Sequence, residues 1–372
     1  YNCHTHVPMT LFRGYAENLP LSRWLHEKIF PAEDRLYPEA VRAASMLAIA
    51  EMLKNGTVSF SDMYFFCDEI VHCVADTGIK ANISRSTVAF DPDICAQKDE
   101  RFQESVQLFE HYHNSADGRI KIDMSIHAEY STVAASCRYL SDFALQNGAR
   151  IHLHLSETAA EHKECLERHG MTPTEFFEKN GVFRVPVIAA HGVHVTDSDI
   201  EILKRYGATV VHNPVSNLKL GSGVMRLTKM LEAGVNVALG TDGAASNNTL
   251  DVQKEAYFAA LLQKGITGDT EKLKSFEFVR MLTKNGAQAQ GRADCGKLAV
   301  GGRADLVLLD FDKISIMPVY DACDSFLYSV NSGCVEMTMV DGNILYENGE
   351  YKTLDIERVK YQFQKVVHTY FE

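Results

Sequence analysis

Apolar and polar positions along the chain follow two different periods that alternate in order. Short β-branched and apolar runs bounded by turn residues are typical of strands, and apolar positions three and four apart are typical of helices. Strand signals occur in the opening segment, which carries the first histidines, and at 57–64, 81–88, 120–130, 150–157, 185–193, 208–214 and 235–243. Helical patterns lie at 38–54, 67–77, 97–115, 132–147, 159–180, 196–206, 225–233 and 249–264.

This strict alternation predicts parallel strands joined by helical crossovers. Eight such units close naturally into a TIM-type (β/α)8 barrel, which usually needs about 250 residues. A doubly wound open sheet is the alternative, but it normally uses fewer units, and no GxGxxG turn follows the first strand. We therefore predict an α/β fold whose barrel spans residues 1–295.

After a predicted helix at 275–290, the sequence pattern changes from alternating strands and helices to short strands alone. Short strand signals separated by Gly and Asn-Gly turns occur within 296–312 and 336–351. Such turns are typical of antiparallel hairpins. We predict a small β unit at 296–352, followed by a C-terminal segment at 353–372 that forms a helix.

Composition narrows the class of protein. A net charge of −12, with no concentrated run of Lys and Arg, disfavours nucleic acid as a partner. The nine cysteines are odd in number and show no CxxC spacing, which is typical of reduced thiols in a cytoplasmic protein. No apolar run is long enough to span a membrane, and no signal peptide is visible. Because the chain begins with Tyr1 and not Met, we expect further sequence upstream.

Metal-ligating side chains occur at the ends of several predicted strands, where barrels of this type hold their active sites. His4 and His6 are two residues apart, so on an extended strand both imidazoles face the same side. His154 and Asp242 lie at the ends of two other predicted strands. Three imidazoles and one carboxylate suit zinc or ferrous iron and leave one position for water. The sequence therefore predicts one divalent metal ion, zinc or iron.

Two residues near His154 add to this picture. His152 alternates with His154 on the same strand and is the alternative ligand. Glu157 follows where the strand gives way to a loop, and a general acid/base is expected at such a position. The alternative is a glutamate at a helix start, favoured there by the helix dipole.

The segments NCHTH, HLHLSE, AAHGVH, HNPVSNLKLGSG and GTDGAASNN together resemble the amidohydrolase superfamily over essentially the whole chain. Within it, the sequence is most similar to the branch of 5-methylthioadenosine/S-adenosylhomocysteine deaminases and related chlorohydrolases, which share the last two segments almost verbatim. Several superfamily members bridge two metals with a carboxylated lysine on strand four. The corresponding segment here, IKIDMSIHAEYS, ends without one. The resemblance therefore implies a mononuclear site.

Carried over to this sequence, the resemblance implies a role for each residue at the strand ends. It assigns the metal to the four ligands named above and makes Glu157 the proton shuttle to N1 of a purine. Asp242 then accepts a proton from the water that attacks C6, and His191 is the polar partner of that attack. His194 is expected to be structural, and His212 to orient the loop that carries Asp242.

Substrate recognition is expected from a lid. Residues 13–36 resemble the family's first lid, and Trp24 and Glu33 fall on matching positions. A carboxylate at Glu33 that accepts both ribose hydroxyls would explain a preference for nucleosides over free bases. The alternative makes Glu33 one of several surface glutamates in this stretch.

Three further residues match substrate-contacting positions of the family. Arg85 and Arg101 correspond to positions associated with an amino-acid tail, and a guanidinium can bind such a carboxylate bidentately. His127 corresponds to a histidine that contacts the purine or the ribose. The alternatives are a solvated helix-face arginine at 101 and a core histidine at 127.

These features together predict a zinc-dependent deaminase of an adenine nucleoside, working as a homo-oligomer. The nearest enzymatic alternative is a deaminase or chlorohydrolase of guanine, a triazine or another heterocycle. A non-catalytic amidohydrolase-like scaffold is the alternative of another class, and the complete ligand set argues against it. In the family a small β-sandwich is assembled from both chain ends, and its N-terminal part is absent from this sequence.

Overall fold

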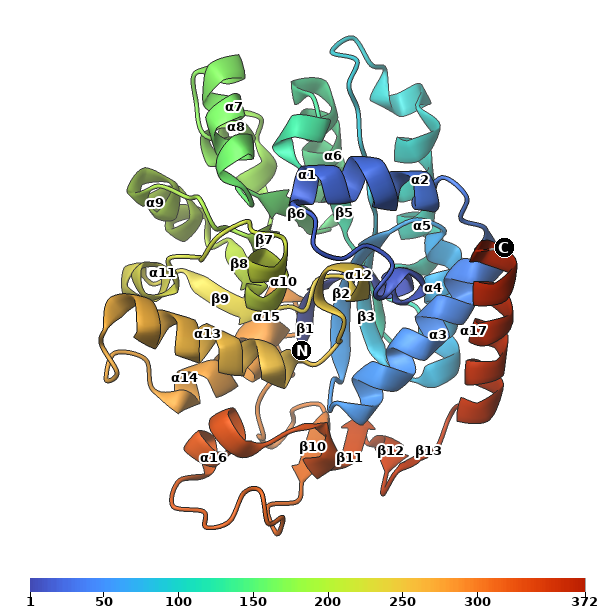
Figure 1. Ribbon diagram of the computed structural model, residues 1–372. Coiled ribbons are helices and arrows are strands. Elements are labelled where there is room, and N and C mark those ends of the chain that lie inside the picture. The colour runs from blue at the N-terminus through green and yellow to red at the C-terminus, as the bar shows by residue number, and fades with distance from the viewer. Residues whose placement is uncertain (372) are drawn as a thin grey trace.

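The computed structural model describes residues 1–371 and contains two parallel sheets with helices around them (Figure 1). The four-stranded sheet has the order β1-β2-β3-β4 and the five-stranded sheet the order β5-β6-β7-β8-β9. The strands are β1 Asn2–Thr5, β2 Ser59–Tyr64, β3 Lys80–Arg85, β4 Ile120–Ile122, β5 Met124–Ile126, β6 Ile151–Leu155, β7 Val187–His191, β8 Thr209–His212 and β9 Asn236–Leu239. All their pairings are parallel, which confirms the parallel α/β class that the alternation predicts.

The two sheets meet at both of their edges. β4 and β5 are halves of the single strand predicted at 120–130, and between them the Asp123 N–H donates to the Ile83 carbonyl at 3.0 Å. At the opposite edges, the Asp242 N–H donates to the His4 carbonyl at 2.9 Å. Gly240 permits this approach, because a Cβ there would lie 2.8 Å from the backbone of His4.

Helices follow most strands where the sequence predicts them. The predicted helix at 159–180 is divided, because Gly170 adopts a φ of +66° and a Thr172–Glu175 capping box starts a new helix. The longer helices are α3 Pro38–Lys54, α4 Cys67–Thr77, α5 Glu100–Tyr112, α6 Ala134–Asn147, α7 Ala159–His169, α8 Pro173–Lys179, α9 Asp197–Tyr206, α11 Leu227–Ala233 and α13 Val252–Thr267. The predicted helix at 275–290 comprises α14 Ser275–Arg280, a π-helical turn at Met281–Asn285 and α15 Gly286–Ala289.

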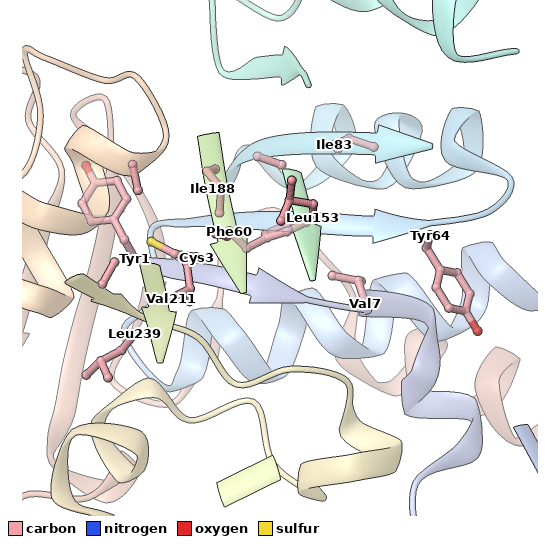
Figure 2. Packing of buried hydrophobic residues seen from close by; sticks show 14 of the residues in the cluster. Tyr1, Cys3, Val7, Phe60, Tyr64, Ile83, Leu153, Ile188, Val211 and Leu239 are labelled. Carbon is pink, nitrogen blue, oxygen red and sulfur yellow. The ribbon is translucent and has the colours of Figure 1, made fainter. Parts of the chain in front are cut away.

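The core lies between the strands and the surrounding helices. Apolar side chains from both parallel sheets, labelled in Figure 2, are fully buried. Every residue of β6 is buried, as expected for a parallel strand covered on both faces, and one of those faces carries His152 and His154. Among the strand residues in this core are Phe60, Ile83, Leu153, Ile188, Val211 and Leu239. The buried core fixes the strands, so the residues at their ends have a rigid support.

A helical segment that the sequence pattern did not predict crosses the end of the sheets. It runs through α1 Leu21–Trp24, a π-helical turn at Leu25–Ile29 and α2 Phe30–Glu33. Pro31 lacks an N–H and disrupts the usual i to i−4 bonding, and the π turn lies just before it. Because proline is disfavoured inside helices, its presence argues against a helix when only the sequence is considered.

The C-terminal region forms an antiparallel sheet of order β10-β11-β12-β13. Its strands are β10 Leu306–Leu309, β11 Val335–Val340, β12 Asn343–Glu347 and β13 Glu350–Tyr351, and an unpredicted helix, α16 Ala322–Ser329, precedes β11. Buried Lys80 of β3 joins this sheet to the parallel ones, because its Nζ lies 2.6 Å from both Asp305 and Asp341.

The last described helix is α17 Ile356–Phe371, which falls within the C-terminal segment predicted to be helical and runs beside α3 in Figure 1. Within residues 1–371, no helix combines the length and apolar character needed to cross a membrane.

Candidate metal centre and active site

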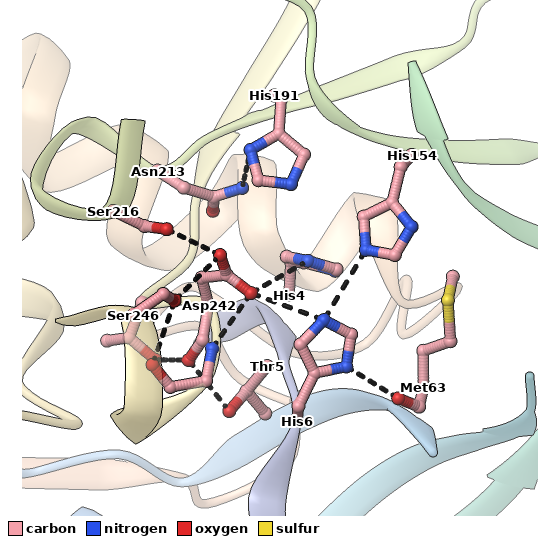
Figure 3. A network of polar contacts seen from close by, with 12 residues as sticks. His4, Thr5, His6, Met63, His154, His191, Asn213, Ser216, Asp242 and Ser246 are labelled. Atoms are coloured by element: carbon pink, nitrogen blue, oxygen red, sulfur yellow. Dashed lines mark hydrogen bonds and ion pairs between the residues drawn. The ribbon is translucent and has the colours of Figure 1, made fainter. Parts of the chain in front are cut away.

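Imidazoles from three strands converge with one carboxylate at the ends of the parallel sheets (Figure 3). His4 lies in β1 and His6 directly after it, while His154 comes from β6. One ligand atom from each of these three residues lies within 4.8 Å of the others, and the same holds for His4, His191 and Asp242. The structure therefore brings together all four residues that the sequence predicts as metal ligands.

Contacts at the far side of each ring orient these imidazoles. Nδ1 of His6 lies 2.6 Å from the Met63 carbonyl, and Nδ1 of His154 lies 2.6 Å from the His127 carbonyl. A carbonyl only accepts hydrogen bonds, so each Nδ1 carries the proton and each Nε2 presents a lone pair to the centre. Rings held in this way are typical of metal-binding histidines.

His4 shows the same arrangement with a different partner. Its Nδ1 lies 2.9 Å from Nε2 of His152, and its Nε2 is buried without a hydrogen-bond partner among the described residues. Asp242 Oδ1 is 3.4 Å from this Nε2, outside hydrogen-bond geometry. A buried imidazole nitrogen without a partner fits a metal ligand. His152, the alternative ligand, instead lies behind His4 and belongs to neither group of ligand atoms.

The two oxygens of Asp242 have different partners, and Oδ1, which faces the metal-ligand cluster, also accepts from the Gly243 N–H at 2.8 Å. Oδ1 lies 3.2 Å from Nε2 of His6, whereas Oδ2 accepts hydrogen bonds from Ser216 at 2.6 Å and Ser246 at 3.0 Å. The backbone of Asp242 has a φ of +61°, a left-handed conformation that a non-glycine residue adopts only when its surroundings impose it. The two serines belong to α10 Pro214–Lys219 and α12 Ala244–Asn247.

Glu157 lies beside this cluster and is buried. Its Oε1 accepts a hydrogen bond from the Ser222 hydroxyl at 3.0 Å, and its Oε2 lies 3.8 Å from Nε2 of His191. Burial raises the pKa of Glu157 above the usual range of a glutamate, although the neighbouring His191 lowers it in part. A carboxyl whose pKa is shifted toward neutrality can both donate and accept a proton.

Glu161, at the start of α7, supports the backbone on which Glu157 stands. Its two carboxylate oxygens accept from the Ser156 N–H at 3.0 Å and the Glu157 N–H at 2.6 Å. Ser156 has a φ of +45°, which costs about 1 kcal/mol or more in a residue with a side chain. The buried Glu161 carboxylate offsets this cost and fixes the direction of the Glu157 side chain.

His191 is the last residue of β7, and His194 lies in the turn that follows. The Nδ1 of His191 lies 2.8 Å from Asn217 Oδ1 and 3.4 Å from Asn213 Nδ2, and its backbone φ is +73°. His194 contacts the Ser222 carbonyl through Nε2 at 2.7 Å, so it supports the loop that bonds Glu157. This contact fits the structural role expected of His194.

His212 was expected to orient the loop that carries Asp242, but its ring makes no hydrogen bond to that loop among the described residues. Both ring nitrogens of His212 are buried without partners in the described structure, and burial lowers the pKa of this ring to about 3. Buried Glu255 instead connects the segments HNPVSNLKLGSG and GTDGAASNN. It accepts hydrogen bonds from Asn247 Nδ2 at 2.6 Å and from the Val215 N–H at 3.1 Å.

The sequence singles out Glu33 and Trp24 of the lid segment, and of these two Glu33 lies close to His6 of the metal-ligand cluster. Burial raises the pKa of Glu33 to about 7, and the Tyr64 hydroxyl and His6 beside the carboxyl lower it in part. The Trp24 ring is buried, and its Nε1 has no hydrogen-bond partner among the described residues. The Glu33 carboxyl is thus near the metal-ligand cluster, whereas the Trp24 N–H is enclosed by protein.

His127 lies next to the metal-ligand cluster, with its ring 4.9 Å from that of His154. Its Nδ1 is 2.7 Å from the Ser131 hydroxyl, and burial lowers its pKa to about 4, so the ring is neutral near pH 7.

The two arginines predicted to bind a substrate tail each form an ion pair within the protein. Arg85 donates to Glu104 at 2.6 Å, and Arg101 donates to Asp99 at 2.6 Å and 2.8 Å.

Sequence reasoning assigned no role to several residues that shape this site. Ser216, Ser246 and Asn217 stand inside the two motifs with the strongest resemblance, so their presence in those motifs was the available signal. Glu161 and Glu255 resemble ordinary glutamates of a first helical turn. Only their burial in the folded chain distinguishes them.

Parallel strands with a buried imidazole and carboxylate cluster at their ends define the class of metal-dependent hydrolases. Residues 1–345 match the model of the amidohydrolase family, and the chain belongs to this family. It is 41% identical over 369 residues to a 5-methylthioadenosine/S-adenosylhomocysteine deaminase of Acetivibrio thermocellus, covering 98% of this chain and 84% of the relative. A protein of the same name from Dictyoglomus thermophilum is 43% identical over 364 residues, with 98% and 84% covered.

The fold of this chain also matches that of a solved structure of a deaminase. The chain superposes on an adenosine deaminase from Xanthomonas campestris that has bound zinc, with a TM-score of 0.93 and 32% sequence identity. The match covers 99% of this chain and 84% of that one.

Proposed function

We propose that this protein hydrolyses the 6-amino group of an adenine nucleoside, yielding the inosine derivative and ammonia. The observation that carries the proposal is the set of three imidazoles and one carboxylate with Glu157 beside it. Relatives that are 41% and 43% identical and named for 5-methylthioadenosine and S-adenosylhomocysteine support the substrate class.

One zinc ion fits the donor set better than a harder cation, because imidazole nitrogens predominate. His4, His6, His154 and Asp242 would hold it, and the ion would supply the Lewis acidity that makes a water nucleophilic near neutral pH. Iron is the alternative from the same donor set. Elemental analysis of purified protein distinguishes the two metals.

Two carboxyl groups of the chain transfer protons during the reaction, and one imidazole stabilises the intermediate. Asp242 Oδ1 faces the centre and accepts a proton from the water that adds to C6. Glu157, with its raised pKa, donates a proton to N1 as the addition proceeds. His191 stands 3.8 Å from Glu157 and stabilises the polar tetrahedral carbon. The proton accepted by Asp242 reaches the amine, which leaves as ammonia, and the proton of the C6 hydroxyl returns to Glu157 as the C6 carbonyl forms. One water is consumed for each ammonia released, and both carboxyl groups regain their starting protonation states.

The lid residues are proposed to select the nucleoside. Glu33 binds the ribose hydroxyls, Trp24 encloses the ligand from the lid, and His127 contacts the purine or ribose from beside His154. Arg85 and Arg101 bind a charged tail only by exchanging their present partners, Glu104 and Asp99.

The finer architecture belongs to the same proposal. We propose that the two parallel sheets form one closed (β/α)8 barrel over 1–295, because backbone hydrogen bonds join them at both edges. The β unit at 296–352 is proposed as part of a β-sandwich, with 353–372 as a separate C-terminal segment. A homo-oligomeric state and a cytoplasmic location stay predictions.

Ammonia release over a panel of purine nucleosides, with metal content measured on the same sample, tests the function. We expect release from adenosine, 5-methylthioadenosine and S-adenosylhomocysteine at about one zinc per chain. Release from guanine or a triazine alone would contradict the proposal, and two tightly bound ions per active chain would contradict the mononuclear site.

A further inference from the structure

The last turn of the C-terminal helix packs against the lid. The chain end lies beside the segment that connects α2 to α3 in Figure 1, although more than 300 residues separate the two in sequence. Tyr370 is one of two buried residues of α17, the other being Val359 near its start. Between them a cavity of about 640 Å³ lies between α17 and α3. Phe363, Val366 and Val367 of α17 also pack against the core, and Tyr370 anchors the last turn of the helix on the lid.

Contacts from four lid and near-lid residues surround Tyr370. Its hydroxyl donates to the Ala32 carbonyl, one residue before Glu33. The Arg35 guanidinium lies 5.0 Å above the phenol ring, and its Nη1 donates to the Tyr370 carbonyl at 3.5 Å. The rings of Phe12 and Tyr37 lie 5.9 Å and 6.2 Å from that of Tyr370.

These contacts bracket Glu33 on both sides along the chain. Ala32 is bonded on one side and Arg35 on the other, so the backbone of Glu33 has little freedom to move. Glu33 also lies close enough to raise the pKa of the Tyr370 phenol to about 12 together with burial, the larger cause, while Arg35 opposes the rise. The carboxylate, the phenol and Tyr64 therefore form one contiguous group above the centre.

We propose that Tyr370 is a positioning residue that holds Glu33 in place, so that the end of α17 determines the preference for substrates with a vicinal ribose diol. The inference rests on the proposed function, in which Glu33 binds that diol. Loss of the Ala32 contact leaves the metal ligands and Glu157 where they are. It therefore affects only substrates whose hydroxyls Glu33 can bind.

The test compares Tyr370→Phe with Tyr361→Phe on two substrates. Tyr361 is on the same helix and 68% exposed, so its variant is a matched control for loss of one hydroxyl. Adenosine carries the diol, and 2′,3′-dideoxyadenosine lacks it. A hydrogen bond contributes about 0.5–1.5 kcal/mol, so we expect Tyr370→Phe to lower kcat/KM for adenosine by about 3- to 10-fold. The value for dideoxyadenosine, the zinc content and the control variant stay unchanged.

A second variant keeps the proposal testable if Tyr370→Phe folds poorly. Arg35→Gln removes the other contact from an exposed position, and we expect the same selective loss on adenosine. In a Glu33→Gln background, Tyr370→Phe should add almost no further loss, because the two changes act through one interaction. Equal losses on both substrates, or additive losses with Glu33→Gln, would overturn the positioning role.

Failure of this inference is distinguishable from failure of the proposed function. If the wild-type protein deaminates neither nucleoside, the function itself is wrong. If it deaminates both equally well, the role of Glu33 fails and the inference fails with it. If the wild-type protein prefers adenosine, Glu33→Gln abolishes that preference and the Tyr370 and Arg35 variants retain it, only the positioning role of Tyr370 is wrong.

Discussion

The metal centre and the lid differ in how they are built. The ligands stand at the ends of buried parallel strands, and their positions follow from strand register and from contacts such as that of His6 with Met63. The lid is a helical segment outside the sheets, and the Tyr370 hydroxyl at the other end of the chain donates to the carbonyl of Ala32, one residue before Glu33. In the proposed function, the chemistry belongs to the residues at the strand ends and the selection of the substrate to the lid.

The largest loss of activity is expected from a change at the metal centre. Asp242→Ala removes the only carboxylate ligand and the acceptor of the water proton, so we expect loss of zinc and activity down to the level of chelator-treated protein. Elemental analysis and ammonia release on the same sample check this. A variant that keeps both full zinc and full activity would show that Asp242 is no ligand.

A smaller but still large effect is expected from the acid/base group. Glu157→Gln keeps the size of the side chain and the Ser222 contact but cannot exchange a proton. We expect zinc to be retained and kcat to fall by about 100-fold or more, the usual contribution of a general acid/base. If zinc is lost together with activity, Glu157 is a ligand and the shuttle role is wrong.

The two regions also differ in how far sequence alone predicts them. Alternation on a strand places His4 and His6 on one face, and strand ends in a parallel fold bring His154 and Asp242 to the same place. Alternation puts His152 and His154 on one face and so leaves the choice between them open, whereas the family resemblance favours His154. In the structure, Nε2 of His152 lies 2.9 Å from Nδ1 of His4.

Other features depend on contacts that no local pattern encodes. The lid helix contains Pro31, which disguises its periodicity. Buried Lys80 reads as a surface residue until Asp305 and Asp341 are seen around it. Tyr370 resembles any aromatic of an amphipathic helix, since its partner Ala32 is 338 residues away.

Glu161→Gln tests the support beneath the centre. An amide offers only one acceptor oxygen, so one of the two N–H groups of Ser156 and Glu157 loses its partner. Hydrogen bonds to a charged group contribute about 1.5–3 kcal/mol, so we expect kcat to fall by about 10-fold or more. Zinc content and KM stay close to wild type, because no ligand or lid residue moves.

The matched control for this variant is Glu167→Gln. Glu167 is on the same helix with a side chain 63% exposed, so the same chemical change there should leave kcat untouched. If Glu161→Gln lowers the melting temperature but not kcat measured well below it, Glu161 only caps the helix.

The lid is tested by Glu33→Ala. Adenosine and S-adenosylhomocysteine present the same two hydroxyls, so we expect kcat/KM to fall for both by a similar factor, with zinc retained. Steady-state kinetics on the two substrates check this. A loss confined to S-adenosylhomocysteine would mean that Glu33 contacts the tail and not the ribose.

The smallest effect is expected where the substrate tail meets the arginines. A carboxylate tail would have to displace Glu104 from Arg85 or Asp99 from Arg101, so each arginine exchanges one ion pair for another. The Arg101 side chain is also 36% exposed, where ion pairs are screened and contribute about 1 kcal/mol or less. We therefore expect Arg101→Met to lower kcat/KM for S-adenosylhomocysteine by about 5-fold at most and to leave adenosine unchanged. Arg85, with 16% of its side chain exposed, should show the larger loss of the two. Equal losses on adenosine and S-adenosylhomocysteine would assign both arginines to the fold alone, and the selectivity of the enzyme would then rest on the ribose contact of Glu33.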